Sequence, residues 1–145
     1  MGLDMYLSAK RYLGYGQDEL ANKVGELFHE LGDARVKEIT AELRYWRKAN
    51  AIHKWFVDNV QEGRDECQES WLSREQLEQL LAVIEEVLAD RSKAAKLLPP
   101  QSGFFFGSDI IDEGYWQDLE QTRDGLRNVL KRKLEGWDFY YRASW

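Results

Sequence analysis

Five side chains around position 50 are of the kinds that bind nucleotides. An indole, a guanidinium, an amide and an imidazole follow one another at Trp46, Arg47, Asn50 and His53, and Lys54 adds a second cation. Arg forms paired hydrogen bonds with phosphate, an amide reads a donor–acceptor edge, and an aromatic ring stacks on a base. If this stretch is helical, Trp46, Asn50 and His53 share one face, and Arg47, Asn50 and Lys54 lie on the next row. The stretch is therefore a candidate site for a small anionic, nucleotide-like ligand. The alternative is that the indole widens a core face while the cations are solvated.

A second candidate segment carries three consecutive phenylalanines between glycines. It contains Gln101, Ser102, Phe104, Phe105 and Phe106. Successive side chains of an extended chain point to opposite faces, so at least one ring must meet another element, a partner chain or a ligand. The flanking glycines allow the backbone to approach a ligand closely, and Gln101 and Ser102 offer polar contacts. The alternative is a buried strand under the helices.

No catalytic set, metal site or cofactor motif is predicted. The two histidines, His29 and His53, have no Cys, Asp or Glu at a metal-ligand spacing. The sequence has no nucleophile elbow, and Cys67 lies in a polar stretch that gives a thiol no activation. A general base at His53 is the one enzymatic alternative that stays open.

Charge and composition restrict the class of partner and the compartment. The formal net charge is −6 and the pI is about 5.0, which argues against direct DNA or RNA binding, because that requires a field of Lys and Arg. A single cysteine favours a reducing compartment. No apolar run is long enough to span a bilayer, and the first residues do not resemble a signal peptide. We therefore expect a protein of the cytosol that does not contact a membrane.

Periodicity divides the chain into strands at both ends and helices between them. Residues 3–13 alternate with a period of two up to a break at 14–16, and residues 137–145 are rich in aromatic side chains, so both are predicted strands. Trp71 and Leu72 form a possible third strand. Apolar stripes and capping residues predict helices at 18–31, 41–60, 73–88 and 112–134, with a shorter helical turn at 92–98.

These elements predict one α+β domain spanning residues 1–145. The expected architecture is a small antiparallel sheet, with the terminal strands paired, packed with about four helices. Aromatic rings fall on both faces of the predicted strand at 137–145, and the face that does not meet helices needs cover. A second copy of the chain would provide it, so a homo-oligomer is expected.

Four segments resemble a widespread family of small phage and prophage proteins. The segments are MGLDMYL at residues 1–7, YWRKANAIHKWF at residues 45–56, QSGFFFGS at residues 101–108, and the ending with FYY at 139–141 and SW at 144–145. Some members of that family carry a phosphoglycerate kinase label. This chain is far too short for that two-domain enzyme and lacks its nucleotide site. The resemblance implies a phage origin and does not by itself imply an activity.

The leading hypothesis is a phage accessory protein that acts against host defence. Such proteins can bind and hold small nucleotide signals without converting them, and the candidate residues above suit that task. Two alternatives stay open: an antagonist that docks on a host protein through exposed aromatic side chains, and a small enzyme that uses His53.

Overall fold

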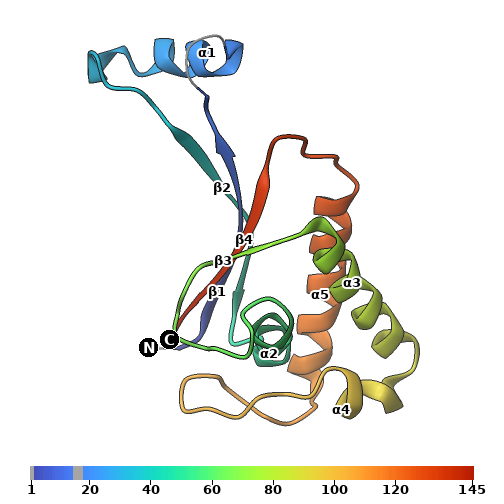
Figure 1. The fold of residues 1–145 in the computed structure, drawn as a ribbon. Helices are drawn as coiled ribbons and strands as arrows, with labels where there is room; N and C mark the ends of the chain where they lie inside the picture. The colour runs from blue at the N-terminus through green and yellow to red at the C-terminus, as the bar shows by residue number, and fades with distance from the viewer. Residues whose placement is uncertain (1, 15–17) are drawn as a thin grey trace.

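The first and last strands of the chain lie side by side at the centre of the molecule (Figure 1). The computed structural model describes residues 2–14 and 18–145. Strands β1 (Asp4–Tyr12) and β4 (Asp138–Ser144) pair antiparallel, and alternate side chains of both are buried, as the period of two indicates. The predicted pairing of the terminal strands is confirmed.

The predicted helix at 41–60 is wrong over its first half. Strand β2 (Glu38–Arg47) occupies that half and pairs with β1 in antiparallel register, and helix α2 (Asn50–Asn59) begins only after it. An apolar residue every three or four positions suits a helix, but the half-buried alternation of a strand fits the same short stretch. Pairing with the free edge of β1 decides between them, because sheet formation depends on tertiary neighbours more than helix formation does.

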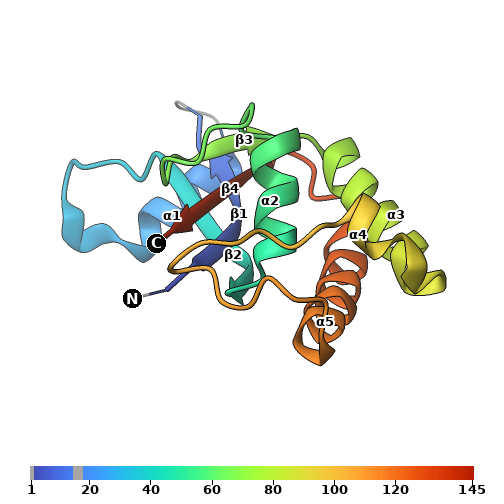
Figure 2. The same ribbon diagram turned by 90° about the horizontal axis from the view of Figure 1, so that it is seen from below.

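Four strands form a sheet in the order β2-β1-β4-β3. The short edge strand β3 (Ser70–Leu72) confirms the possible strand at Trp71 and Leu72. A bulge interrupts the pairing of β1 with β2 between Leu7 and Ser8. The views in Figures 1 and 2 place α2, α3 and α5 together on one side of the sheet. The small antiparallel sheet and the α+β class are as predicted.

The helices begin where their capping residues indicate. Ser73 and Gln76 form the predicted reciprocal capping box, and the Asp112 carboxylate accepts from the backbone amide of Tyr115. The predicted helices at 73–88 and 112–134 are thereby confirmed, although the second one ends four residues earlier than expected, at Leu130. The elements concerned are α3 (Arg74–Ala89), a 3₁₀ turn η2 (Arg91–Lys93), the one-turn helix α4 (Ala94–Leu97) and α5 (Glu113–Leu130).

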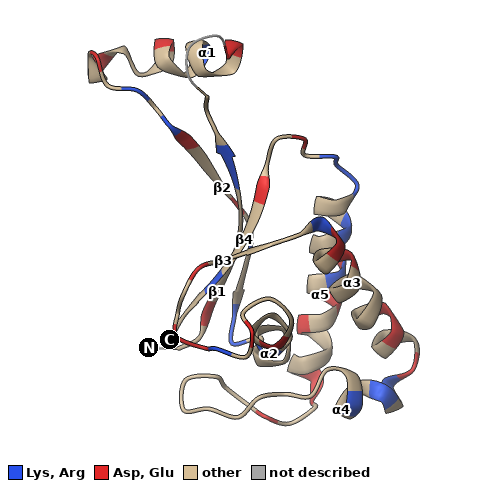
Figure 3. Ribbon diagram, viewed as in Figure 1, with Lys and Arg blue, Asp and Glu red and all other residues tan. Residues whose placement is uncertain are grey.

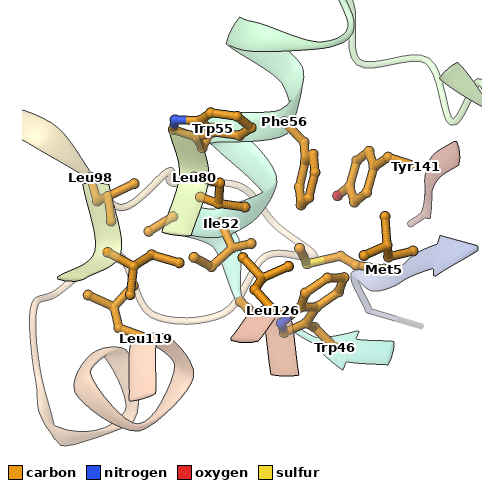
Figure 4. Close-up of a cluster of buried hydrophobic side chains, with 14 of the residues drawn as sticks. Met5, Trp46, Ile52, Trp55, Phe56, Leu80, Leu98, Leu119, Leu126 and Tyr141 are labelled. Carbon is orange, nitrogen blue, oxygen red and sulfur yellow. The ribbon is translucent and has the colours of Figure 1, made fainter. Parts of the chain in front are cut away.

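One hydrophobic core fills the space between the sheet and these helices. Phe56 of α2 stacks on Tyr141 of β4, with ring centroids 3.9 Å apart and planes 10° apart. Figure 4 shows these two rings beside Met5 and Trp46, with leucines of α3 and α5 and Leu98, just after α4, closing the cluster. Buried side chains of the sheet, α2, α3 and α5 all belong to this one cluster.

An arm leaves this body on the extension of β1 and β2 (Figure 1). Its end carries helix α1 (Glu19–Leu27) and the 3₁₀ turn η1 (His29–Leu31). The predicted N-cap is confirmed, since the Asp18 carboxylate accepts from the Leu20 amide at 3.0 Å. The expected break at residues 14–16 lies partly outside the described residues. The arm therefore holds the predicted first helix away from the core.

Candidate functional site

Trp46 belongs to β2 and is buried in the core. Only 5% of the residue is exposed, and its indole Nε1 donates to Thr122 Oγ1 of α5 at 2.8 Å. The Thr122 hydroxyl in turn donates to the backbone oxygen of Asp118. The indole therefore links the sheet to α5 and has no free face on which a ligand base could stack. The shared helical face predicted for Trp46, Asn50 and His53 does not exist.

Asn50 binds the chain's own backbone. Its Nδ2 donates to the carbonyl oxygens of Phe106 (3.0 Å) and Ser108 (2.7 Å), and its Oδ1 accepts from the amide of Gln101 (3.0 Å). The side chain is buried, and both amide hydrogens are used. The Asn50 amide thus donates and accepts hydrogen bonds, as the sequence indicates, but its partners are backbone groups of the segment 101–108 and not those of a ligand.

His53 lies fully buried between an acid and a phenol. Its Nδ1 is 2.7 Å from the Tyr141 hydroxyl and its Nε2 is 2.9 Å from the Asp65 carboxylate, which also accepts from the Trp145 indole at 2.9 Å. Burial raises the pKa of Tyr141 well above its usual value. An acid beside an imidazole is what general-base catalysis needs. Here, however, both ring nitrogens are engaged and no edge of the ring is open to a substrate.

The three phenylalanines form a turn and separate from one another. Phe106 is buried, with its ring 5.2 Å from that of His53, whereas Phe104 is 95% exposed and Phe105 is half-buried against the core. The turn is closed by the Phe106 amide, which donates to the Gly103 carbonyl. A Cβ at Gly103 would lie 2.9 Å from the Phe106 ring, so this turn requires glycine. The prediction that at least one ring meets another element is confirmed by Phe106, and the alternative of a buried strand is not.

Of the remaining sequence candidates, Lys54 and Ser102 lie outside this buried network, whereas the backbone of Gln101 belongs to it. Lys54 pairs with Asp58 at 2.6 Å on the outer side of α2, and Ser102 is exposed. The side-chain oxygen of Gln101 is buried and has no hydrogen-bond partner among the described residues. Of the ten residues proposed from the sequence, the structure brings only Arg47 and Asn50 to the wall of a common pocket.

That pocket lies where α2 begins, facing the first turns of α5. Its volume is about 250 Å³. Arg47, Lys48 and the first turn of α2 form one wall, Gln117, Asp118 and Gln121 of α5 form another, and the segment around Gly107 and Ser108 closes a third side. Residues about 60 positions apart in the sequence thus meet around one polar hollow.

The α2 side of the pocket is electropositive. Helix α2 has no side-chain cap and no acidic residue in its first turn. The amides of Ala51 and Ile52 have no hydrogen-bond acceptor within the described chain. Arg47 and Lys48 stand directly before these amides, and Figure 3 shows the end of β2 in blue as it enters α2. Free amides, the positive end of a helix and two cations favour an anion at this place.

The backbone around Lys48 is held in an unusual conformation. Lys48 has φ 58°, in the left-handed region, and its amide donates to the Leu3 carbonyl at 2.8 Å. Gly107 has φ 84°, and a Cβ there would lie 3.4 Å from the Lys48 side chain. Non-glycine residues in this region cost about 1–3 kcal/mol and concentrate at functional sites. This turn thereby fixes the position of the Lys48 side chain on the wall of the pocket.

The α5 side supplies hydrogen-bonding groups and two acids, because Asp112 and Asp118 both line the pocket. Burial, together with the negative charge of Asp112, raises the pKa of Asp118 to about 6. Gln117 and Gln121 lie beside it, one helical turn apart. Sequence reasoning missed this wall. Gln117, Asp118 and Gln121 form a polar row beside the predicted apolar stripe of α5, and that row could have been noticed in the sequence. Nothing in the sequence, however, indicates that the row faces α2.

Comparison of the chain with models of protein families, with curated proteins and with solved structures gave no match. Within residues 2–14 and 18–145, no group of three or more His, Cys, Asp or Glu side chains is placed to hold a metal ion. None of the helices in the same ranges is both long and apolar enough to cross a membrane.

Proposed function

We propose that this protein binds a small anionic, nucleotide-like ligand in the pocket between α2 and α5 and holds it without converting it. The observation that carries the proposal is the uncapped start of α2, where two free amides meet Arg47 and Lys48. A phosphate group bound there is attracted by the positive end of α2 and by Lys48, and it adds a second partner to Arg47, whose guanidinium already lies 3.4 Å from the Asp4 carboxylate. Phosphate is one of the anions for which a helix N-terminus is a ready-made binding site.

The opposite wall suits the remainder of such a ligand. Gln117, Gln121 and the carboxyl of Asp118 offer donors and acceptors for the edge of a base or for ribose hydroxyls. The volume of about 250 Å³ lies just below the usual range of ligand pockets, about 300–1,000 Å³, which limits the ligand to about one nucleotide unit. His53 and Cys67 are not among the lining residues, which favours holding over turnover.

The resemblance to phage proteins supplies the biological setting of the proposal. A phage protein that holds a nucleotide-derived signal in the host cytosol lowers the free concentration of that signal and silences the defence response that it triggers. The acting form is a homo-oligomer in this proposal.

Ligand retention tests the proposal directly. The purified protein is incubated with cyclic nucleotides and ADP-ribose-derived compounds, desalted and heated, and the released compounds are identified by mass spectrometry. We expect one compound to be recovered intact. Lys48→Gly removes the ammonium while matching the left-handed backbone, so retention should fall at least tenfold with the fold unchanged.

Lys54→Ala is the matched control, because Lys54 lies on α2 outside the pocket and pairs with Asp58. It should retain the ligand like the parent protein. A Lys48→Gly variant that still retains the full amount would contradict the site. Recovery of a converted product would show an enzyme, and the absence of any retained compound would refute ligand binding.

A second candidate function rests on the face of the sheet that the helices leave open. Tyr6 and Tyr45 lie with ring centroids 5.5 Å apart on this face, and Tyr140 and Trp71 occupy opposed register positions on it. Tyr45 is 42% and Trp71 56% exposed. Exposed Tyr and Trp side chains are typical of protein interfaces, so this face is where a host protein would dock. Tyr45→Ser and Trp71→Ser would then abolish the biological effect while ligand retention is unaffected.

A further inference from the structure

One edge of the sheet carries a long strand whose outer side has no neighbouring strand. Strand β2 spans ten residues at that edge (Figure 2), whereas β3 at the opposite edge spans three. Apart from the ladder with β1, no backbone hydrogen bond joins residues 38–47 to any other described residue. An edge strand of this length is a template on which another strand can pair.

The contacts at the two ends of β2 show which of its backbone groups are free. The Leu13 amide donates to the Lys37 carbonyl at the start of the strand, and the Lys48 amide donates to the Leu3 carbonyl at its end. Successive residues of an antiparallel strand direct their backbone groups to alternate sides. Counted inward from both ends, the residues whose N–H and C=O groups point away from β1 are therefore Glu38, Thr40, Tyr45 and Arg47.

The bulge makes the two halves of β2 complementary. Leu43 has no partner in the register with β1, so the alternation of faces shifts by one residue there. As a result, the four residues with free backbone groups all share the open face of the sheet. A two-fold axis through the bulge therefore places Glu38 opposite Arg47 of a second copy, with their free backbone groups facing each other. Thr40 and Tyr45 are opposed in the same way.

The charges at the two ends of β2 attract each other in this arrangement. The side chains of Glu38 and Arg47 are 47% and 55% exposed. Their partners within the chain are distant ones, because Lys10 lies 4.0 Å from Glu38 and Asp4 lies 3.4 Å from Arg47. Since the axis is two-fold, the Glu38–Arg47 contact forms once at each end of the paired strands. A shift of the register by two residues in either direction separates both contacts.

The same features favour another copy of this chain as the added strand. Charges and a bulge on an edge strand prevent its pairing with most other strands. In β2 they leave one favourable register, in which an acid meets a base at both ends and the bulge lies on the axis. On the side of the helices, that register sets Ile39 opposite Trp46 and Ala41 opposite Arg44. A strand with the sequence of β2 itself meets all of these conditions.

We propose that the protein forms a two-fold dimer in which the β2 strands of two copies pair antiparallel about Glu42 and Leu43 and join two four-stranded sheets into one. Ten residues per copy are fewer than the roughly 20–30 of a standard interface, so the affinity is modest, on the order of micromolar. The two Glu42 carboxylates approach each other at the axis, which weakens the pairing further. The inference goes beyond ligand binding. Because Arg47 also lines the pocket, the tests follow the mass of the protein without ligand.

The mass of the full-length protein in solution, measured by sedimentation or light scattering from about 1 to 100 µM, tests this interface. The parent protein should approach the dimer mass as its concentration rises. Glu38→Arg and Arg47→Glu should each weaken the dimer about tenfold, because each places like charges at both ends. An equimolar mixture of the two variants should recover it, since every acid then meets a base, and so should the double variant. Glu42→Gln should strengthen the dimer, because it removes the repulsion at the axis.

Thr40→Pro tests the backbone pairing itself. The Thr40 amide points away from β1, so proline removes no hydrogen bond of the monomer but blocks the added strand. This variant should keep the circular dichroism spectrum of the parent protein and stay monomeric.

Glu66→Arg is the matched control, because it makes the same charge change as Glu38→Arg at an exposed position in the loop before β3, at the other edge of the sheet. It should dimerise like the parent protein. A parent protein that stays monomeric at about 100 µM overturns the proposal. So does a folded Thr40→Pro variant that still dimerises, or a mixture of the two charge variants that fails to recover association.

Discussion

Replacement of Asn50 distinguishes two roles of this side chain: ligand binding, which the sequence suggests, and anchoring of the segment 101–108, which the structure shows. A residue whose side chain only binds a ligand can be replaced by alanine with little change in the free energy of unfolding. Asn50 instead makes three buried or half-buried hydrogen bonds to backbone groups of the segment 101–108. Asn50→Ala removes all three and leaves carbonyl groups of that segment without their donors.

The expected cost follows from those contacts. A hydrogen bond contributes about 0.5–1.5 kcal/mol net, so three bonds amount to about 3 kcal/mol. For a domain of this size each kcal/mol corresponds to roughly 2–4 °C, and the melting temperature should therefore fall by about 10 °C. Asn50→Asp should cost at least as much, because it sets a carboxylate oxygen against the Phe106 and Ser108 carbonyls.

Urea and thermal unfolding followed by circular dichroism measure the change. Asn59→Ala is the control at the other end of α2, since Asn59 is exposed and its side chain donates a hydrogen bond to Trp55 O, while the bond that its backbone oxygen accepts from Gln76 remains in the variant. Its cost should stay below about 1 kcal/mol. The anchoring role of Asn50 is refuted if Asn50→Ala unfolds at the same urea concentration as Asn59→Ala.

Two further predictions concern α5 and the residue that joins it to the sheet. The pKa of Asp118 is raised to about 6 in the folded protein. Between pH 4 and 6 the folded protein therefore keeps a proton on this carboxyl that the unfolded chain has lost. The contribution of Asp118 to the free energy of unfolding is most favourable at low pH and declines as the pH rises from 4 to 6. Asp118→Asn should accordingly increase the free energy of unfolding at pH 7.5, as measured by urea titration, and the gain should vanish below pH 4. Trp46→Phe removes the hydrogen bond to Thr122 and part of the buried ring, which should lower stability by about 1–3 kcal/mol in the same assay while ligand retention per folded molecule is unchanged. A Trp46→Phe protein that folds normally but no longer retains ligand would restore the sequence-based role of this indole.

Several elements were predictable because their signals are local. The capping box of Ser73 and Gln76 marks the start of α3, and the apolar stripe that follows fixes its buried face. The alternation of residues 3–13 gives both the first strand and its inward side chains. Each of these signals acts between residues a few positions apart, within one turn or one strand.

The stretch before Asn50 was not predictable in the same way. Its apolar positions fit a helix and a strand alike, and the choice depends on the vacant edge of β1, about forty residues away in the sequence. This one change of element separated Trp46 from His53 and removed the helical face on which the first site hypothesis depended.

The sequence by itself determined the class of the fold, the pairing of its ends, most helix starts and the kinds of side chain available for binding. Only the tertiary structure decided how those side chains are used. It turned Asn50 and His53 inward to bind the chain's own groups, and it brought the start of α2 to the polar row of α5. The physical reason is that a side chain's hydrogen-bonding capacity is a local property, whereas its partner is set by which distant segments the core packs together.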